Sequence, residues 1–475
     1  MIRRISRPSI FCAWALGCGS TPPADKSPPG ATDSAAPSEP TWSAGAVPTP
    51  DLPLVRGART LRGIVHLHSP WSHDACDGVP LIDGEPDSDC LADLRSGLCT
   101  AGIDVAWLTD HPSHAAEQSF ADRFHVRSGV DTVVDVDGAP AAARWACDDG
   151  GDVLIRVGYE DTLMPVGLLA PLADDPTTED AIANADDTDT IHTMLDRGAL
   201  VAVAHTEGRD AEWLERVVTD GVGAVELFNL HAAFDPRIRS GDLGFEASDW
   251  VARIAPFTAD DSTLASDLLV LAVLERHTVS LAHWDRLTAA GHRVVGTAGT
   301  DAHQNTLPMD LPDGERGDSF RRMVRWWTQH IRVAESEATD PAAIQDALAR
   351  GHFHVVAEVL GTPTGFDVYA TAADGSVVET GGTVSGGTLT VTCPTLAPTS
   401  PQGPDAPDLT VTVLHNGAAW ATGCGDHPLS APGAYRVEVD IVPHHLRPFL
   451  GAVADDWMTA YPWLFSQPIY VDADG

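Results

Sequence analysis

Histidine and aspartate are concentrated in one short stretch of the sequence, GIVHLHSPWSHDACDG at residues 63–78. It places His66, His68, His73 and Asp74 directly behind a short apolar run. If that run is a β-strand, the two histidines of HLH point to the same face, because side chains two apart lie on one side of a strand. Imidazole nitrogen and carboxylate oxygen together are ligands for Zn, Mn or Fe. One such pair alone is more often solvated, so a metal site needs ligands from elsewhere in the chain.

The same residue types recur where later apolar runs end. A histidine as deep in an apolar run as His205 requires a strong partner, because burying a polar group without one costs free energy. The series indicates that several strand ends contribute to one site, and its members are Asp110 and His111 in LTDH, Glu160 in GYE, His205 in VAVAH, and Asp301 and His303 in GTDAH.

Apolar, β-rich runs carry these residues and alternate with segments of helical periodicity. The runs are LRGIVHLH, IDVAWLTDH, DVLIRVGYE, ALVAVAHTE, GAVELFNLH and RVVGTAGTDAH. Between them lie segments such as IHTMLDRG, AEWLERVVTDG and LAHWDRLTAAGH, in which apolar residues recur at helical spacing. Strand–helix alternation with apolar strands is typical of a parallel α/β sheet or barrel. In α/β barrels the active site lies where the C-terminal ends of the strands converge, which is where these acids and histidines stand.

The rhythm changes in the last quarter of the chain. Residues 59–360 form the predicted α/β domain. Beyond it, GFDVYATA, TLTVTC, LTVTVLHNG and YRVEVDIV alternate and are separated by Gly, Pro and Asp. This pattern is typical of antiparallel strands, so we predict a small C-terminal β-sandwich over residues 361–475.

The N-terminus has the pattern of an export signal. MIRRISR supplies positive charge, and SIFCAWAL is an apolar run too short to cross a bilayer as a helix. Residues 1–18 resemble a bacterial lipoprotein signal that is cleaved before Cys18, and a secretory peptide cleaved nearby is the alternative. Residues 19–58 are rich in Pro, Ser, Ala and Thr and are predicted to form a disordered linker. Either signal predicts export, and the first predicts a lipid anchor in the bacterial envelope, in the periplasm or on the outer-membrane surface.

Export places the cysteines in an oxidising compartment, where disulfides form. After removal of Cys12 and lipidation of Cys18, six of the 8 cysteines remain, and six cysteines allow 15 pairings. Position along the chain favours Cys393–Cys424, which lie alone in the C-terminal region, and proximity favours Cys76–Cys90 and Cys99–Cys147.

Charge and missing motifs exclude several classes of function. With 29 basic and 68 acidic residues the formal net charge is -39, which repels phosphate backbones, so no nucleic-acid partner is predicted. Membrane contact is predicted only through the lipid anchor. The sequence has no GxSxG, P-loop or GxGxxG motif, so covalent serine chemistry and nucleotide cradles lack support.

In their order along the chain, HLHSPWSHD, LTDH, the Glu of the third run, VAVAH and GTDAH resemble the polymerase and histidinol phosphatase (PHP) superfamily. The resemblance covers about residues 60–358. It implies a distorted (β/α)7 barrel that binds two or three divalent metal ions (Zn, Mn or Fe) and, in most members, hydrolyses phosphate esters. The tail WLFSQPIYVDADG further resembles the branch associated with carbaryl and other carbamate hydrolases.

The resemblance also implies a ligand set. The first metal is assigned His66, His68, Glu160 and Asp301. The second is assigned His111 and His303, with His73 or Asp74 completing it. The third is assigned His205, with Glu160 as a bridge. The stretch DTLMPVGLLAP lacks a histidine that three-metal members carry, so the third ion is weak, absent or completed by a residue such as His231.

These ligands predict a hydrolase that uses a metal-bound hydroxide, with Asp301, Glu160 and His205 as catalytic residues. The predicted substrate is a small ester, first of all a phosphomonoester or phosphodiester. Metal hydroxide also attacks carbonyl carbon, so a carbamate, carboxylic ester or amide is the alternative. A non-catalytic envelope or glycan-binding protein is a third hypothesis. The oligomeric state is left open.

Polar and aromatic residues outside the main series have plainer interpretations. Asn229 is predicted to shape the floor of the site rather than to catalyse. His283, His292 and His330 lie in helix-like segments and are predicted to be on the surface. The pair His352 and His354 in GHFHVV either contacts substrate or is solvated. RRMVRWWTQHIRV, residues 321–333, is predicted to be an amphipathic helix that packs its tryptophans.

Overall fold

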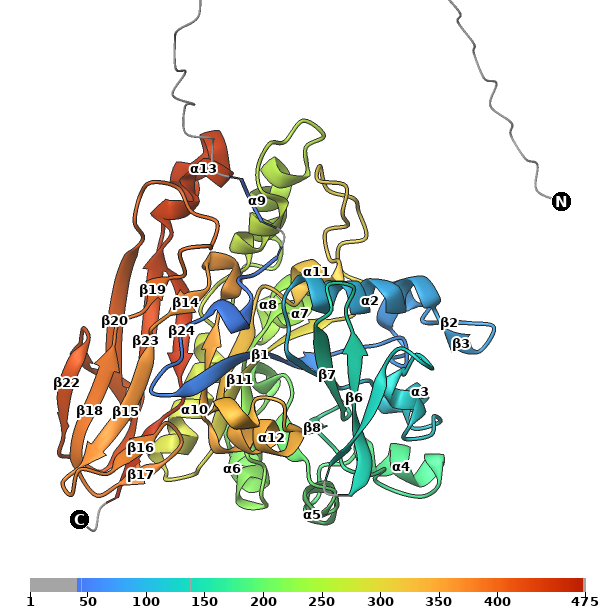
Figure 1. Cartoon of the computed structure of the whole chain (residues 1–475), viewed down its shortest axis with the longest axis horizontal. Coiled ribbons are helices and arrows are strands. Elements are labelled where there is room, and N and C mark those ends of the chain that lie inside the picture. The colour runs from blue at the N-terminus through green and yellow to red at the C-terminus, as the bar shows by residue number, and fades with distance from the viewer. Residues whose placement is uncertain (1–40, 44, 137, 473–475) are drawn as a thin grey trace, which may run out of the picture. The chain divides into compact units, whose positions relative to one another are not determined.

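Parallel strands form the centre of the largest sheet (Figure 1). The computed structural model describes residues 41–43, 45–136 and 138–472. The parallel strands lie in the order β9-β10-β11-β1-β4-β7. They are buried along most of their length, as expected for strands that are covered on both faces. Their bounds are β1 Ala58–Leu67, β4 Val105–Leu108, β7 Asp152–Val157, β9 Leu200–Val203, β10 Ala224–Asn229 and β11 Val295–Ala302.

Antiparallel strands flank this parallel core at both edges. β8 (Leu163–Val166) pairs with β9, while β6 (Ala139–Ala146) pairs with β7 and with β5 (Thr132–Val136). Among the described residues no strand pairing joins the two edges, so the sheet is not closed into a barrel. The mixed α/β class predicted from the sequence is confirmed, whereas the (β/α)7 barrel stays a prediction.

Strand β1 belongs to two arms of the sheet. From Val65 onward it pairs with β11, and its other edge pairs with β4, whereas Ala58–Gly63 pairs antiparallel with β12. The second arm then runs β12-β13-β24-β23-β20-β21. The bounds are β12 Thr328–Ala334, β13 Phe353–Val356, β20 Asp408–His415, β21 Ala418–Thr422, β23 Gly433–Val442 and β24 Tyr461–Ser466, with the short β25 (Ile469–Val471) beside β23 and β17 (Thr383–Val384) beside β25.

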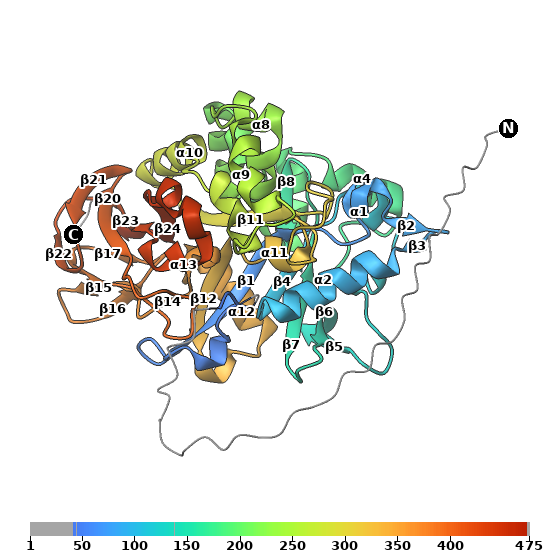
Figure 2. The same ribbon diagram turned by 90° about the horizontal axis from the view of Figure 1, so that it is seen from above.

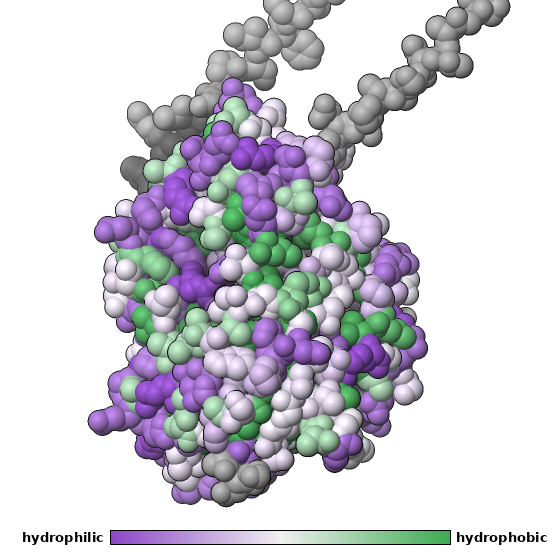
Figure 3. Space-filling model, turned by 90° about the vertical axis from the view of Figure 1, so that its left-hand side faces the viewer, coloured by the Kyte–Doolittle hydropathy of each residue, from purple (hydrophilic) through white to green (hydrophobic). Residues whose placement is uncertain are grey.

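The C-terminal region is built mainly of antiparallel strands, as its alternating sequence predicts, and within it β17 and β25 pair in parallel. Besides the second arm it contains a separate four-stranded sheet, β16-β15-β18-β22. In Figures 1 and 2 these strands gather on one side of the molecule, away from the parallel strands and their helices, and Figure 3 shows their outer face, largely polar with hydrophobic patches. The bounds are β15 Asp367–Ala372, β16 Val377–Glu379, β18 Gly387–Thr392 and β22 Gly425–Leu429. Because β24 pairs with β13, the two predicted domains share one sheet, and the sandwich stays a prediction.

Aspartate N-caps start most of the longer helices. The side chains of Asp87, Asp175, Asp187, Asp210 and Asp340 accept backbone N–H groups at the starts of α2, α4, α5, α6 and α12, which satisfies donors that the helix itself leaves free. These helices are α2 Ser88–Thr100, α4 Pro176–Ala183, α5 Thr188–Asp196, α6 Ala211–Thr219 and α12 Pro341–Arg350. The other longer helices are α9 Asp249–Thr258 and α10 Thr278–Ala289. The shorter helices are α1 Ala75–Gly78, α3 Pro112–Ala115, α7 Leu230–Phe234, α8 Pro236–Gly241, α11 Phe320–Met323 and α13 Arg447–Leu450.

The amphipathic helix predicted for residues 321–333 is wrong. Only α11 (Phe320–Met323) is helical there, and the chain continues as β12, which pairs with β1 on one side and β13 on the other. Tertiary contacts override the helical pattern, because Trp326 and Trp327 are buried in the core and the arginines that precede them bind buried Asp267. His330 is consequently buried within β12, not on the surface, and its Nε2 lies 2.9 Å from Glu358.

The predicted export signal (residues 1–18) and residues 19–40 of the predicted linker lie outside the described residues. Farther along, the same linker is packed rather than extended. Trp42 donates to Asp267 (2.9 Å), Val47 is buried, and Thr49 in a short 3-10 helix (Thr49–Asp51) donates to Asp104 (2.9 Å). Within residues 41–43, 45–136 and 138–472, no helix combines the length and apolar character that crossing a membrane requires.

Three disulfides join the cysteines in the pairs that sequence position favours. They are Cys76–Cys90, Cys99–Cys147 and Cys393–Cys424. The first fastens the loop behind the HLH motif to α2, and the second fastens the end of α2 to the turn before β7. Three such bridges fit an exported protein.

Candidate metal centre

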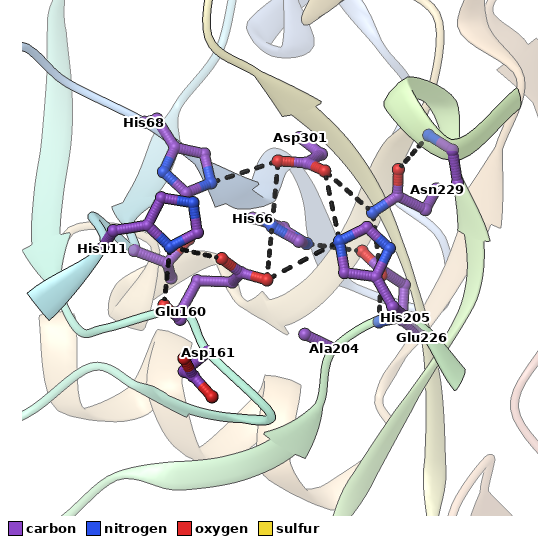
Figure 4. A network of polar contacts seen from close by, with 12 residues as sticks. His66, His68, His111, Glu160, Asp161, Ala204, His205, Glu226, Asn229 and Asp301 are labelled. Carbon is purple, nitrogen blue, oxygen red and sulfur yellow. Dashed lines mark hydrogen bonds and ion pairs between the residues drawn. The ribbon is translucent and has the colours of Figure 1, made fainter. Parts of the chain in front are cut away.

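The histidines and carboxylates predicted as ligands come from the C-terminal ends of the parallel strands and the loops directly after them (Figure 4). β1 supplies His66 and its following loop His68, and β11 supplies Asp301 and then His303. The loops after β4, β7 and β9 supply His111, Glu160 and His205, and α7, which follows β10, supplies His231. Parallel strands bring these ends to one edge of the sheet, so residues more than 200 positions apart meet there.

Backbone turns, rather than regular strand alternation, aim three of these side chains. His66 has φ 72°, His205 φ 51° and Asp301 φ 49°, all in the left-handed region that non-glycine residues seldom occupy. At His66 the register of β1 against β11 shifts between Val65 and Leu67. The two histidines of HLH do share a side, as the sequence predicts, but a bulge at the strand end produces that arrangement. Such strain persists where the surrounding structure enforces it, which is common at functional sites.

Asp301 lies at the centre of the cluster. Its Oδ1 is 3.2 Å from His66 Nε2 and 3.1 Å from His68 Nε2, and its Oδ2 is 3.4 Å from His205 Nε2. Asn229 donates from Nδ2 to the same Oδ2 at 3.2 Å and also caps α7, which places it in the floor of the site. His66, His68 and Asp301 are almost entirely buried.

Glu160 forms the second bridge between groups of histidines. Its Oε1 lies 3.6 Å from His205 Nε2 and 3.9 Å from His66 Nε2, while its Oε2 lies 2.8 Å from His111 Nδ1. One carboxylate therefore faces imidazoles from β1 and from the loops after β4 and β9. The role of Glu160 as a bridge between metal ions stays a prediction.

Asp74 approaches the outer histidines, whereas His73 is exposed at the rim. The Asp74 carboxylate lies 3.6 Å from His111 Nε2 and 3.4 Å from His303 Nε2. The His73 ring lies 4.9 Å from the His111 ring, centroid to centroid. Of the two residues that the sequence leaves open for the second metal, Asp74 is the one that contacts both partners.

Five of the predicted ligand histidines are held from behind through Nδ1, whereas Nδ1 of His231 has no partner among the described residues. Backbone carbonyls hold His111 through Glu160 O and His303 through Asp301 O, both at 2.9 Å. Side chains hold the others, and these contacts are His66 with Glu226 (2.7 Å), His68 with Ser72 Oγ (2.8 Å) and His205 with Glu207 (3.1 Å). An acceptor on Nδ1 fixes that nitrogen as the N–H donor and leaves the Nε2 lone pair for the centre, as in known metal sites.

Several buried atoms of the predicted ligands have no hydrogen-bond partner among the described residues, although a carboxylate oxygen stands only 3.1–3.4 Å from three of the imidazole nitrogens. They are His66 Nε2, His68 Nε2, His303 Nε2, His231 Nδ1, Asp74 Oδ1, Glu160 Oε2 and Asp301 Oδ1. Buried polar atoms without a partner are rare because they are costly. Lone pairs that converge without bonding to one another fit a divalent cation, which accepts several of them at once.

Neighbouring carboxylates and burial have opposite effects on the pKa values of His66 and His205. Burial opposes a positive charge on His66, but the carboxylates of Asp301 and Glu226 outweigh it and raise the pKa of His66 well above its usual value. Burial likewise opposes a charge on His205, and hydrogen bonds to Asp301 and Glu207 raise its pKa well above the usual range. Both imidazoles therefore hold a proton that a metal ion must displace.

Other groups already have the protonation state of a ligand. Burial, and next the charge of His303, lower the pKa of His68 to about 3, so this imidazole is neutral. Burial disfavours the carboxylate of Asp301, but the neighbouring histidines lower its pKa well below the usual range and keep it ionised.

All ten predicted ligands fall into groups whose donor atoms lie within 4.8 Å of one another. The groups overlap, and His231 joins Asp301 and His303 in one of them. They are His68–His111–His303, His66–His68–Glu160, His66–His205–Asp301, His73–Asp74–His111 and His231–Asp301–His303. His352 and His354 belong to none of these groups; they lie before and within β13, which pairs with β12.

Sequence reasoning missed the side chains that orient the ligands. Glu226, Glu207 and Ser72 are buried and contact the outer nitrogens of His66, His205 and His68. For Glu226 a signal exists, because an acidic residue in the middle of the apolar run GAVELFN is expensive to bury unless it has a partner.

No family model matches the sequence. The search of curated proteins found no match either. Among solved structures, the crystal structure of PsfC from Pseudomonas syringae PB-5123 is similar over 61% of this chain and 98% of that chain, at 13% sequence identity and a TM-score of 0.27. A similarity at this level carries no argument about fold or function.

Proposed function

We propose that the protein is a metal-dependent hydrolase of the PHP type, with residues 59–360 as its distorted barrel and residues 361–475 as a β-sandwich. The observation that supports this proposal most directly is the set of imidazoles whose Nδ1 is held from outside and whose Nε2 faces a shared pair of carboxylates. His66, His68, His205, Glu160 and Asp301 would hold the inner ion or ions, and His111, His303 and Asp74 the outer one. Divalent ions bound there would lower the pKa of a water molecule and draw charge from the bond to be cut.

The chain's own residues hold this arrangement in place. Asp301 and Glu160 each touch more than one histidine, so one carboxylate can serve two ions. Asn229 fixes the outer oxygen of Asp301 by donating to it. Because His66 and His68 are almost completely buried and His205 and His111 are half-buried, a substrate reaches the centre from the side of the latter two.

A phosphate ester is the proposed substrate class. A second candidate, a carbamate, carboxylic ester or amide, has a specific observation in its favour. Within the described residues no arginine forms an ion pair with any ligand, and this part of the chain contains no lysine. A site whose ligands pair with no arginine suits a substrate with less negative charge than a phosphomonoester.

The test compares the wild-type chain with Asp301→Ala and with a control variant, His283→Ala, which changes a half-buried helical histidine away from the cluster. Each protein is loaded with Mn or Zn, its metal content is measured, and hydrolysis of aryl phosphate, diaryl phosphate and aryl carbamate is followed. Activity on a phosphate that falls to background only in Asp301→Ala supports the proposal, and activity on the carbamate alone supports the second candidate. Less than about one ion per chain would instead favour a non-catalytic binding protein, because working sites retain their ions.

We also propose export as a lipoprotein, since the three disulfides suit an oxidising compartment. Replacement of Cys18 by Ser should abolish incorporation of labelled fatty acid and release the protein from membranes. A Cys18→Ser chain that stays membrane-bound would contradict the anchor.

A further inference from the structure

A cavity of about 260 Å³ lies far from the metal centre. Its walls come from the start of β1, from β12, β13 and β15, and from the end of β16. Ala58 borders it, whereas His66 is at the other end of the same strand, roughly 26 Å away at about 3.3 Å per residue. One water molecule occupies about 30 Å³ in the liquid. The cavity volume is several times larger, so the cavity has room for a small organic molecule.

Arg332 Nε and the ring nitrogens of His354, on the wall of this cavity, have no hydrogen-bond partner within the described residues. His354 is only 6% exposed as a residue, but its ring nitrogens are not closed off from solvent. Its neighbours are the rings of His330 and Phe366, at 5.2 and 5.1 Å between centroids. A ligand in the cavity would replace solvent as the hydrogen-bond partner of these nitrogens.

The arginines and Glu379 of the wall already form ion pairs, with one another or with Asp367, which does not line the cavity. Arg56 donates to Asp367 at 2.6 Å and to Glu379, and Arg332 donates to Asp367 and to the carbonyl of Phe366. Two guanidinium groups and two carboxylates thus cancel. A phosphate or carboxylate ligand would have to break an existing ion pair, and so would an ammonium group.

Besides these ion pairs, the wall offers hydrogen-bond donors, hydrogen-bond acceptors and an apolar surface. A neutral imidazole offers one donor and one acceptor, and His352 on the same wall doubles that capacity. Burial, followed by the charges of His330 and Arg332, lowers the pKa of His354 well below its usual value, and burial also lowers that of His352. Phe366 and Val368 supply an apolar surface.

We propose that this cavity binds a neutral, polyhydroxylated molecule with the size of a single sugar ring, and that His354 is its principal hydrogen-bond partner. Hydroxyl groups both donate and accept, as the imidazole requires, and the C–H face of a sugar ring packs on Phe366 and Val368. The site is independent of the metal centre, so this inference does not rest on the proposed function.

The test titrates the full chain with glucose, galactose, xylose and glycerol, and in parallel with inorganic phosphate and glycine, by calorimetry and ligand-observed NMR. His354→Phe keeps an aromatic ring but removes both nitrogens, and Val368→Phe fills the cavity from another strand. His444→Phe is the matched control, because His444 belongs to a 3-10 helix that does not line the cavity.

Saturable binding of one of the sugars or of glycerol is expected, weakened about tenfold or more by His354→Phe, the change expected from one lost hydrogen bond to a buried group. Val368→Phe should also weaken it, and His444→Phe should not. If His354→Phe unfolds, Val368→Phe decides the question alone. Absence of binding by every neutral probe, binding that both cavity variants leave unchanged, or binding of phosphate or glycine only would each overturn the proposal.

Discussion

Glu226 reaches His66 across a neighbouring strand. Its Oε1 lies 2.7 Å from His66 Nδ1, although β11 runs between β10 and β1. The crossing takes place over Gly299, where a Cβ atom would collide with that same oxygen. The same carboxylate accepts from the backbone N–H of His205 through Oε2 at 3.0 Å. One buried residue on β10 therefore positions ligands that come from two other strands.

Replacement of Glu226 by Gln should weaken metal binding by about 10- to 100-fold, the usual range for residues that orient a metal ligand. Gly299→Ala should have a similar effect, because the added methyl group displaces the Glu226 carboxylate. Affinity is measured by competition with a chromophoric chelator. Glu335→Gln, which alters an exposed ion pair with Arg59, is the control and should bind metal like the wild type. Equal affinity in all four proteins would contradict the assigned role.

Metal affinity should rise with pH, because the pKa values of His66 and His205 are raised and a metal ion must displace their protons. Each displaced proton contributes about a tenfold gain in affinity per pH unit below the pKa. Calorimetry of Zn or Mn binding at pH 6 and pH 8, in two buffers of different ionisation enthalpy, measures both the affinity and the protons released. Affinity that is independent of pH with no proton release would rule out this description of the site.

Glu358→Gln should destabilise the fold by about 3–5 kcal/mol, because it leaves Arg62 buried without its counter-charge. Arg62 Nη2 lies 2.8 Å from Glu358, and both side chains are fully buried. Burial raises the pKa of Glu358, but Arg62 and His330 outweigh it and lower that pKa well below the usual range. A depressed carboxylate pKa stabilises the fold above the unfolded value of about 4.3 and loses that contribution as the pH falls.

Chemical denaturation between pH 3 and pH 7 measures both effects. The free energy of unfolding of the wild type should decline as the pH falls below about 4.3, and Glu358→Gln should show a flatter profile from a lower starting point. The exposed variant Glu335→Gln should change stability by no more than about 0.5 kcal/mol. Identical profiles for wild type and Glu358→Gln would refute the buried ion pair.

Removal of a disulfide should destabilise the fold, and the loss should be larger for the disulfide that closes the longer loop. Cys99–Cys147 spans 48 residues and Cys76–Cys90 spans 14, which correspond to losses of about 4 and about 3 kcal/mol from chain entropy. The double-serine variant of each pair is compared by guanidinium denaturation. Removal of Cys76–Cys90 should also weaken metal binding, because the N–H of Cys76 donates to the carbonyl of His303 at 2.9 Å. Unchanged stability in both variants would contradict the pairing.

The candidate site was predictable because its ligands end strands of one parallel sheet. His111, Glu160 and His205 each follow an apolar run, and parallel strands carry such ends to the same edge. The residues that hold the ligands were not predictable in the same way. Ser72 and Glu207 lie in loops whose course depends on tertiary contacts, and no sequence periodicity marks them.

The fold departs from sequence expectation where polar groups are buried in pairs. His330 and the arginines of residues 321–325 look like the polar side of a helix, but each is compensated by a distant acid, Glu358 or Asp267. A pattern of single residues cannot reveal a partner that lies elsewhere in the chain. For the same reason, the residues around Trp42 look like linker in composition, although they contact Asp267, Phe449 and Arg325.

Strand β24 lies between β13 and β23, so the second arm of the sheet has a gap in its middle until residues 461–466 arrive. A chain that emerges N-terminus first, whether from the ribosome or from an export channel, therefore carries β13 with an unpaired edge for more than 100 residues of elongation. Protection of that edge during synthesis, and not only the strength of the finished core, then decides how much protein reaches its native form.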